Sequence, residues 1–128
     1  LEEADGNFVV IDLGNGNFAF YAHMIKGSVA VEVGDFVTRG QVIGLVGNTG
    51  NTIAPHLHFQ MMSGPSTFGS NGVPYMIHEY DLIAQAASTE AFDMAEAEGT
   101  PLEIIPVDNP GIHKDDLPLD LSIINFAE

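Results

Sequence analysis

Short runs of β-prone residues, each closed by glycine, dominate the first two-thirds of this chain. The runs at 8–13 and 17–23 flank Gly14-Asn15-Gly16, and this pattern predicts a β-hairpin. Further short strands are expected at residues 29–33, 41–46, 56–62 and 73–84. No helical spacing of apolar residues separates the runs, so the sequence predicts a mainly β fold built on a curved antiparallel sheet.

The composition changes near residue 85, where acidic residues become frequent. A short helix is expected at 88–98, with Ser88 or Thr89 as its N-cap and Gly99 as its stop. Two short strands are expected at 101–109 and 117–126, separated by a Pro/Gly/Asp loop. Because about 40 residues rarely sustain a core of their own, we expect residues 1–84 to form the β domain and 85–128 to form an appendage packed on it.

Charge and composition exclude several classes of protein. The chain has 128 residues, 45% of them hydrophobic, which suits one domain with a modest core. A net charge of −15 with three Lys/Arg argues against nucleic-acid binding; an acidic surface serves solubility, or suits a basic partner or cations. No apolar run reaches the roughly 18 residues of a membrane span. The absence of cysteine excludes disulfides and thiol chemistry. No basic, apolar stretch typical of a signal peptide stands at the start of the given sequence, from which nothing follows because it begins at Leu1 and not at Met.

The stretch Pro55-His56-Leu57-His58-Phe59 is the clearest candidate for chemistry. Alternate residues of a strand share a face, so His56 and His58 should project together while Leu57, Phe59 and Met61 point into a core. Two imidazoles fixed side by side can share a metal, or can supply one ligand and one proton-transfer group. Two polar histidines on the solvent face of an edge strand would show the same pattern.

Three further histidines have weaker contexts. His23 ends the run at 17–23, and taken alone it is better explained by a structural hydrogen bond to a backbone carbonyl. His78 in a strand-like run and His113 in a polar loop match no pattern, so ordinary surface roles are expected for both.

The order of these pieces resembles the LytM/lysostaphin family of peptidoglycan metallopeptidases. The resemblance covers about residues 7–62. It is specific because several motifs recur in the same order and spacing as in the family. At one position the chain departs from the family, which commonly has His where this chain has Leu13. The motifs are Tyr21-Ala22-His23, Val33-Gly34-Asp35-Phe36-Val37, Gly40-Gln41-Val42-Ile43-Gly44, Gly47-Asn48-Thr49-Gly50 and Pro55-His56-Leu57-His58-Phe59.

The resemblance implies a duplicated-hybrid-motif (barrel-sandwich hybrid) fold and a zinc-dependent endopeptidase that hydrolyses peptide bonds in peptidoglycan, in the periplasm or outside the cell. It implies that His58 is a zinc ligand, and that His23 and His56 are catalytic histidines beside the metal-bound water. Zinc lowers the pKa of a bound water to about 7. One imidazole would accept the proton of this water while the other stabilises the oxyanion.

One part of the family pattern is missing. The family takes two more zinc ligands, a His and an Asp spaced His-x-x-x-Asp, from a segment before these motifs. No histidine precedes His23, and neither Asp5 nor Asp12 follows a histidine by four positions. A catalytic zinc site normally has three protein ligands. The resemblance therefore implies the C-terminal part of an enzyme, which alone should bind zinc poorly and be inactive.

Other interpretations of the function remain open. Residues 33–43 also resemble the turn of biotinyl and lipoyl carriers and of sugar phosphotransferase carriers, but Lys26, the nearest lysine, lacks the sequence context of a biotin or lipoyl site. A phosphohistidine carrier also uses paired histidines. A non-catalytic LytM-like module that binds or regulates cell-wall hydrolases is the main alternative. An upstream His-x-x-x-Asp would favour the enzyme, and its absence the regulator.

Overall fold

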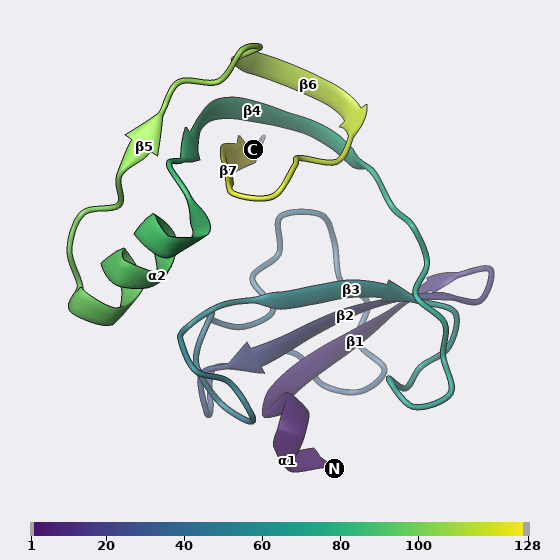
Figure 1. The fold of residues 1–128 in the computed structure, drawn as a ribbon. Helices are drawn as coiled ribbons and strands as arrows, with labels where there is room; N and C mark the ends of the chain where they lie inside the picture. Colours follow the sequence, from purple (N-terminus) through teal and green to yellow (C-terminus); the bar gives the residue numbers. More distant parts are fainter. Residues whose placement is uncertain (1, 127–128) are drawn as a thin grey trace. The chain divides into compact units, whose positions relative to one another are not determined.

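The computed structural model describes residues 2–126, and over this range the chain is mainly β, as predicted (Figure 1). It divides into two compact units, Leu1–Pro74 and Tyr75–Glu128. The first unit contains α1 (Glu2–Asp5), β1 (Asn7–Gly14), β2 (Asn17–Met24) and β3 (His58–Met62). The second contains β4 (Ile77–Ala86), α2 (Thr89–Glu98), β5 (Ile104–Ile105), β6 (Gly111–Asp116) and β7 (Ser122–Phe126).

The first unit is built on an antiparallel sheet of order β1-β2-β3. The hairpin predicted for β1 and β2 is confirmed, and Gly14 pairs with Asn17 across its turn. Asn15 and Gly16 both have positive φ, 53° and 77°. Asn-Gly is favoured in such two-residue turns because both positions require the left-handed conformation.

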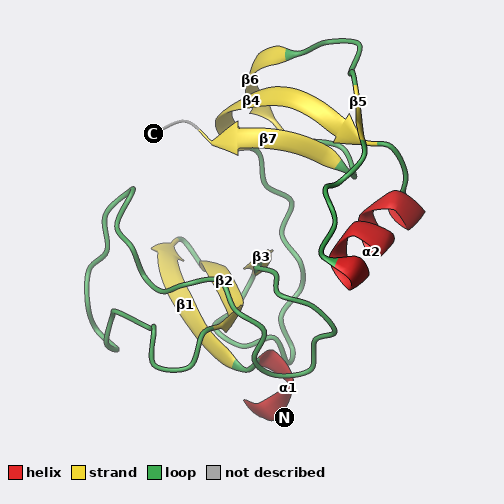
Figure 2. Ribbon diagram, turned by 90° about the vertical axis from the view of Figure 1, so that its left-hand side faces the viewer, coloured by secondary structure: helices red, strands yellow, loops and turns green. Residues whose placement is uncertain are grey.

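Residues 25–57 form a long connection instead of the strands expected at 29–33 and 41–46 (Figure 2). The two segments approach each other, because the amide of Ala30 donates to the carbonyl of Ile43 at 3.0 Å. Regular pairing does not develop, and Val33 and Val42 remain exposed. The strand predictions here are wrong, since apolar β-branched composition does not make a strand without a continuous ladder and a covered face.

The buried cluster of the first unit is small and lies on one face of its sheet, while Ala19 is buried on the other face. Phe20, Ala22 and Met62 are buried together, and Val10 and Phe18 pack against them. These side chains share a face because Val10 pairs with Phe20 and Phe18 pairs with Met62 across the strands.

The second unit is organised around β4, which pairs with β5, β6 and β7. The boundary expected between residues 84 and 85 falls inside this continuous strand, whereas the compact units divide after Pro74. Within residues 117–126, where a strand is expected, β7 forms at Ser122–Phe126 and pairs with β4. The loop predicted before them contains β6, which pairs with residues 77–82 of β4, so that prediction is wrong.

The predicted helix is confirmed as α2, with both expected caps. Ser88 Oγ accepts from the amide of Ala91 at 3.1 Å, and Gly99 has the left-handed φ of 64° typical of a helix C-terminus. Between residues 2 and 126, no helix is long and apolar enough to span a membrane.

Deleting residues 117–128 should destabilise the second unit because β4 loses the strand that pairs with its residues 80–85. We expect the melting temperature, measured by circular dichroism, to fall by more than about 5 °C, since roughly 1 kcal/mol shifts a domain of this size by about 4–8 °C. The control is Leu119→Ser, which changes a side chain that is 83% exposed in the same segment and should leave the melting temperature almost unchanged. A deletion that melts like the parent chain would show that β7 does not stabilise the sheet.

Candidate active site

Three histidines of the first unit come together at one end of its sheet. The ring centroids of His23 and His56 are 4.8 Å apart, and those of His23 and His58 are 5.7 Å apart. His23 lies near the end of β2, His58 begins β3, and His56 lies just before β3, where it forms an isolated bridge with Gly47. The convergence expected from the sequence is therefore present.

A bulge in β2 turns His23 toward the other two rings. Val9 pairs with Tyr21 and Asn7 with Met24, so three steps along β2 match two steps along β1. His23 itself has a φ of 61°. Ala22 pairs with His58, and strict alternation would place His23 on the opposite face. The extra residue and the left-handed backbone break that alternation.

The loop that contains Thr49 holds the ring of His23. His23 Nδ1 lies 2.8 Å from the carbonyl oxygen of Thr49, and the side chain is only 6% exposed. Because a carbonyl oxygen can only accept, Nδ1 carries the proton and the neutral ring keeps its lone pair on Nε2. Thr49 is fixed in turn, since its Oγ1 donates to the carbonyl of Met24 at 2.7 Å and accepts from the amide of Asn7 at 2.9 Å.

His56 has the same tautomer for the same reason. Its Nδ1 lies 2.8 Å from the carbonyl oxygen of Ala54 and 3.1 Å from Thr52 Oγ1. The Thr52 hydroxyl itself donates to the Ala54 carbonyl at 2.9 Å. Donation from Nδ1–H leaves the lone pair of His56 on Nε2, and the residue is exposed to solvent.

His58 differs from the other two histidines in its tautomer and its surroundings. Its Nε2 lies 2.9 Å from Gln60 Oε1, so Nε2–H donates to the amide oxygen and the lone pair is on Nδ1. The ring stands edge-on to Phe20, with centroids 5.7 Å apart. His58 thus lies on the face of the buried cluster.

The residues expected to point from β3 into the core do not do so. Leu57 is 42% exposed, and Phe59 and Met61 are only partly buried. Phe59 packs instead against Tyr21 on the other face, with ring centroids 4.9 Å apart. Burial raises the pKa of the Tyr21 phenol, which therefore stays neutral near pH 7. The expected orientation is wrong because Met62, one position further along, fills the core.

Asp5 and Asp12, the aspartates that precede the histidines in the sequence, are engaged in local structure. Asp12 Oδ1 accepts from the amide of Gly14 at 2.8 Å in the hairpin turn, and Asp5 Oδ2 accepts from the Thr67 hydroxyl at 3.5 Å. Among residues 2–126, no three His, Cys, Asp or Glu side chains are placed to hold a metal ion together. The described residues therefore do not form a complete metal site by themselves.

The other two histidines lie in the second unit. His78 Nδ1 is 3.1 Å from Asp115 Oδ1 on an exposed surface. His113 lies in β6, not in the expected loop, and its ring stacks on Tyr80 with centroids 5.2 Å apart. Burial, followed by the charge of Asp116 and its hydrogen bond, raises the pKa of Tyr80.

Two residues that orient the histidines were not singled out from the sequence. In the sequence Thr49 stands out only as part of the motif Gly47-Asn48-Thr49-Gly50, and no motif includes Gln60. Gln60 could have been found, because it lies two residues after His58 and therefore shares its strand face. The carbonyl of Thr49 could not, because its contact with His23 joins positions 26 residues apart.

Comparison with known proteins identifies the family of this chain. The family model described as "Peptidase family M23" matches residues 1–73, more than half of the chain. The chain belongs to this family. The peptidoglycan DD-endopeptidase ShyA of Vibrio cholerae is 47% identical over 57 residues, which are 44% of this chain and 13% of that protein.

Staphylococcal relatives match shorter segments of the chain. Lysostaphin of Staphylococcus simulans is 54% identical over 43 residues, 34% of this chain and 8% of the relative. The glycyl-glycine endopeptidase ALE-1 of Staphylococcus capitis is 48% identical over 52 residues, 41% of this chain and 13% of the relative. The segment aligned with this M23 chain thus spans about an eighth or less of the length of each relative. No solved structure matches significantly.

Replacing Gly47 by Ala should disturb the histidine cluster through the backbone. A Cβ on Gly47 would lie 2.5 Å from the amide nitrogen of Ile25 and 2.8 Å from the carbonyl carbon of Met24. The loop must then move away from β2 and take the Thr49 carbonyl with it. We expect the free energy of unfolding in urea to fall by about 1–3 kcal/mol, the usual cost of overpacking. The ring of His23 should also change its NMR chemical shifts.

Gly72→Ala is the matched control, since no atom lies within 4 Å of a Cβ built there. It should leave both the unfolding free energy and the His23 signals close to those of the parent chain. Equal effects of the two substitutions would contradict the role given to the close approach at Gly47.

Proposed function

We propose that this chain carries the histidine part of a zinc-dependent endopeptidase site that hydrolyses peptide bonds in peptidoglycan. The observation that carries the proposal is the convergence of His23, His56 and His58 inside the region matched by the M23 model. The names of two relatives, the peptidoglycan DD-endopeptidase ShyA and the glycyl-glycine endopeptidase ALE-1, support the reaction and the substrate class. Such a substrate would place the protein in the periplasm or outside the cell.

In this proposal His58 is the one zinc ligand that the chain supplies, through Nδ1. Donation of Nε2–H to Gln60 supports this choice, because a ligating histidine commonly donates its other N–H to a neighbouring acceptor. The remaining ligands would be the family's His and Asp, from polypeptide outside these 128 residues. When bound, zinc would act as a Lewis acid and activate water.

His23 and His56 are proposed to move protons and to stabilise charge. Each donates Nδ1–H to a backbone carbonyl, which leaves Nε2 as the basic nitrogen. One Nε2 can accept the proton of the attacking water and later return it to the leaving amine. The other ring, once protonated, can stabilise the negative charge that develops on the scissile carbonyl oxygen.

A non-catalytic role is the second candidate. The observation that favours it is the incomplete donor set among residues 2–126. A module of this kind would keep the groove of the family and bind or regulate cell-wall hydrolases without metal.

Alanine substitutions should separate the roles of the three histidines in a longer polypeptide that supplies the missing ligands. His58→Ala should lose both zinc and activity. His56→Ala and His23→Ala should retain zinc but cleave peptidoglycan slower by a factor of about 10² or more, as expected for loss of a general base or an oxyanion donor. Zinc content and turnover are measured side by side.

His78→Ala serves as the matched control, because His78 pairs with Asp115 in the second unit. It should keep both zinc and turnover. If His56→Ala lost zinc as completely as His58→Ala, the division of roles would be wrong. If no variant changed turnover in a polypeptide with the complete ligand set, the enzyme itself would be rejected in favour of the regulatory module.

The 128-residue chain alone should hold zinc weakly. With one proposed ligand, it cannot compete for zinc against a chelator. After incubation with zinc and dialysis, elemental analysis should find far less than stoichiometric metal. Tightly held stoichiometric zinc, lost on His58→Ala but kept in His78→Ala, would mean that other residues of this chain complete the site.

A further inference from the structure

A groove of about 390 Å³ lies within the second unit, apart from the histidines of the first. Its apolar lining comes from Phe92 of α2, Leu102 before β5, and Leu121 and Ile123 at the start of β7. Two carboxylates, Asp93 and Asp120, also line it. The lining thus combines an apolar surface with negative charge.

The helix that forms one wall of this groove is little supported by packing. None of the side chains of α2 is buried, and Phe92 and Met94 are 44% and 59% exposed. Ten residues are fewer than the about 12–15 that an isolated helix needs to be stable in water. The caps at Ser88 and Gly99 hold the ends of the helix, while its apolar side chains remain available to a ligand.

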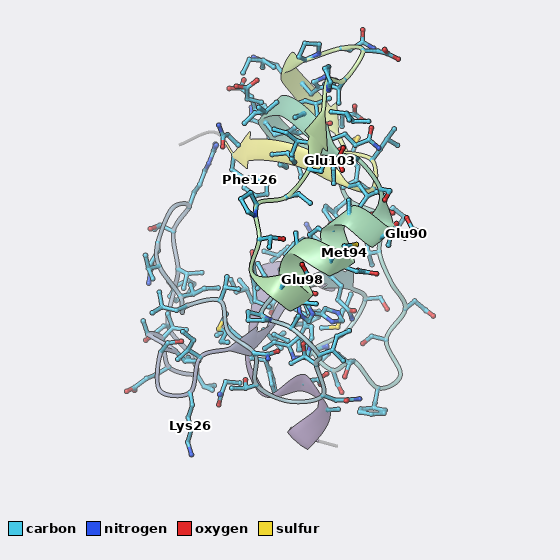
Figure 3. The ribbon with its side chains drawn as sticks, turned by 60° about the vertical axis from the view of Figure 1, so that its left-hand side comes forward. Lys26, Glu90, Met94, Glu98, Glu103 and Phe126 are labelled. Atoms are coloured by element: carbon cyan, nitrogen blue, oxygen red, sulfur yellow. The ribbon has the colours of Figure 1, made fainter. Side chains whose placement is uncertain are left out.

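The charge of the second unit restricts what can bind there. Residues 75–128 contain twelve acidic residues and one basic residue, a net charge of −11. The single basic residue, Lys114, is already paired with Glu79 at 2.8 Å. Figure 3 shows Glu90, Met94 and Glu98 along α2, so the helix presents both negative and apolar side chains, as the groove lining does.

We propose that this groove docks a basic amphipathic segment of a partner protein. An apolar side chain of the partner enters between Phe92 and Ile123, and flanking Lys or Arg side chains face Asp93 and Asp120. Opposite charge accelerates such an encounter and selects the partner, while the apolar contact contributes affinity. The proposal does not depend on peptidase activity.

Charge disfavours the other possible occupants of the groove. Nucleic acids and anionic membranes are negative like the groove. A second copy of the chain has a net charge of −15 and would be repelled in the same way. The first unit contains six acidic and two basic residues, a net charge of −4. Its only basic side chains that could face the carboxylates of the groove are those of Lys26 and Arg39.

The test measures binding of a fluorescein-labelled peptide of alternating Lys and Leu to the 128-residue chain by fluorescence anisotropy. Asp93→Asn with Asp120→Asn should weaken binding about tenfold, the effect of losing close charge pairs. The matched control, Glu96→Gln with Glu98→Gln, makes the same change in net charge on α2 outside the groove lining. It should weaken binding by less than about threefold.

A second pair of variants tests the apolar contact. Phe92→Ala should weaken binding about tenfold, whereas Met94→Ala, which changes an exposed residue of the same helix outside the groove, should not. Neither side chain is buried, so circular dichroism should show both variants folded.

Three outcomes would overturn the proposal. If the Asp93/Asp120 and Glu96/Glu98 double variants weakened peptide binding equally, the peptide would be attracted to the acidic surface in general and not to the groove. Equal affinity for a Lys–Gly peptide of the same length and charge would show that the groove takes no apolar side chain. Binding of purified peptidoglycan, but not of the Lys–Leu peptide, with the same sensitivity to Asp93 and Phe92 would assign the groove to a cell-wall ligand.

Discussion

The contact between the Thr49 loop and the end of β2 determines the arrangement of the histidines. The Thr49 carbonyl accepts from His23, and the Thr49 hydroxyl donates to the Met24 carbonyl beside it. A left-handed conformation at a non-glycine residue costs of order 1–3 kcal/mol and persists only where surrounding contacts enforce it. These hydrogen bonds surround the one residue of β2 with positive φ, His23. The close packing also explains the glycine at position 47, since any side chain there would meet the backbone of β2.

Different hydrogen-bond partners give the three histidines different tautomers on one small surface. His23 and His56 donate Nδ1–H to backbone carbonyls, whereas His58 donates Nε2–H to the side chain of Gln60. The position of the free lone pair is therefore set by neighbours and not by the histidines themselves. In the proposed active site, this division would leave two histidines to handle protons and one to bind metal.

The two units achieve stability in different ways. The first has a small buried cluster around Phe20 and a long connection whose apolar residues, such as Val33 and Phe36, are almost fully exposed. The second depends on β4, whose residues Tyr80, Ala84 and Ala86 are buried among its partner strands. Its helix contributes acidic and apolar surface and no buried residue. Most of the acidic residues thus lie in a unit with its own sheet.

The sequence by itself determined the features that depend on neighbouring residues. The β1–β2 hairpin follows from Asn15-Gly16, the ends of α2 from Ser88 and Gly99, and the family from the order of its motifs. These signals are local, because backbone conformations and caps depend on a few consecutive residues.

Tertiary structure decided what depends on residues far apart in the chain. The apolar segments at 29–33 and 41–46 resemble strands but lack a continuous ladder, and β6 forms from a polar segment because β4 offers it partners. The side of the sheet that His23 faces was likewise undetermined, since strand alternation alone points it away from His58. A bulge opposite β1 and a carbonyl 26 residues along the chain reverse that direction, because register and long-range hydrogen bonds are properties of the folded sheet.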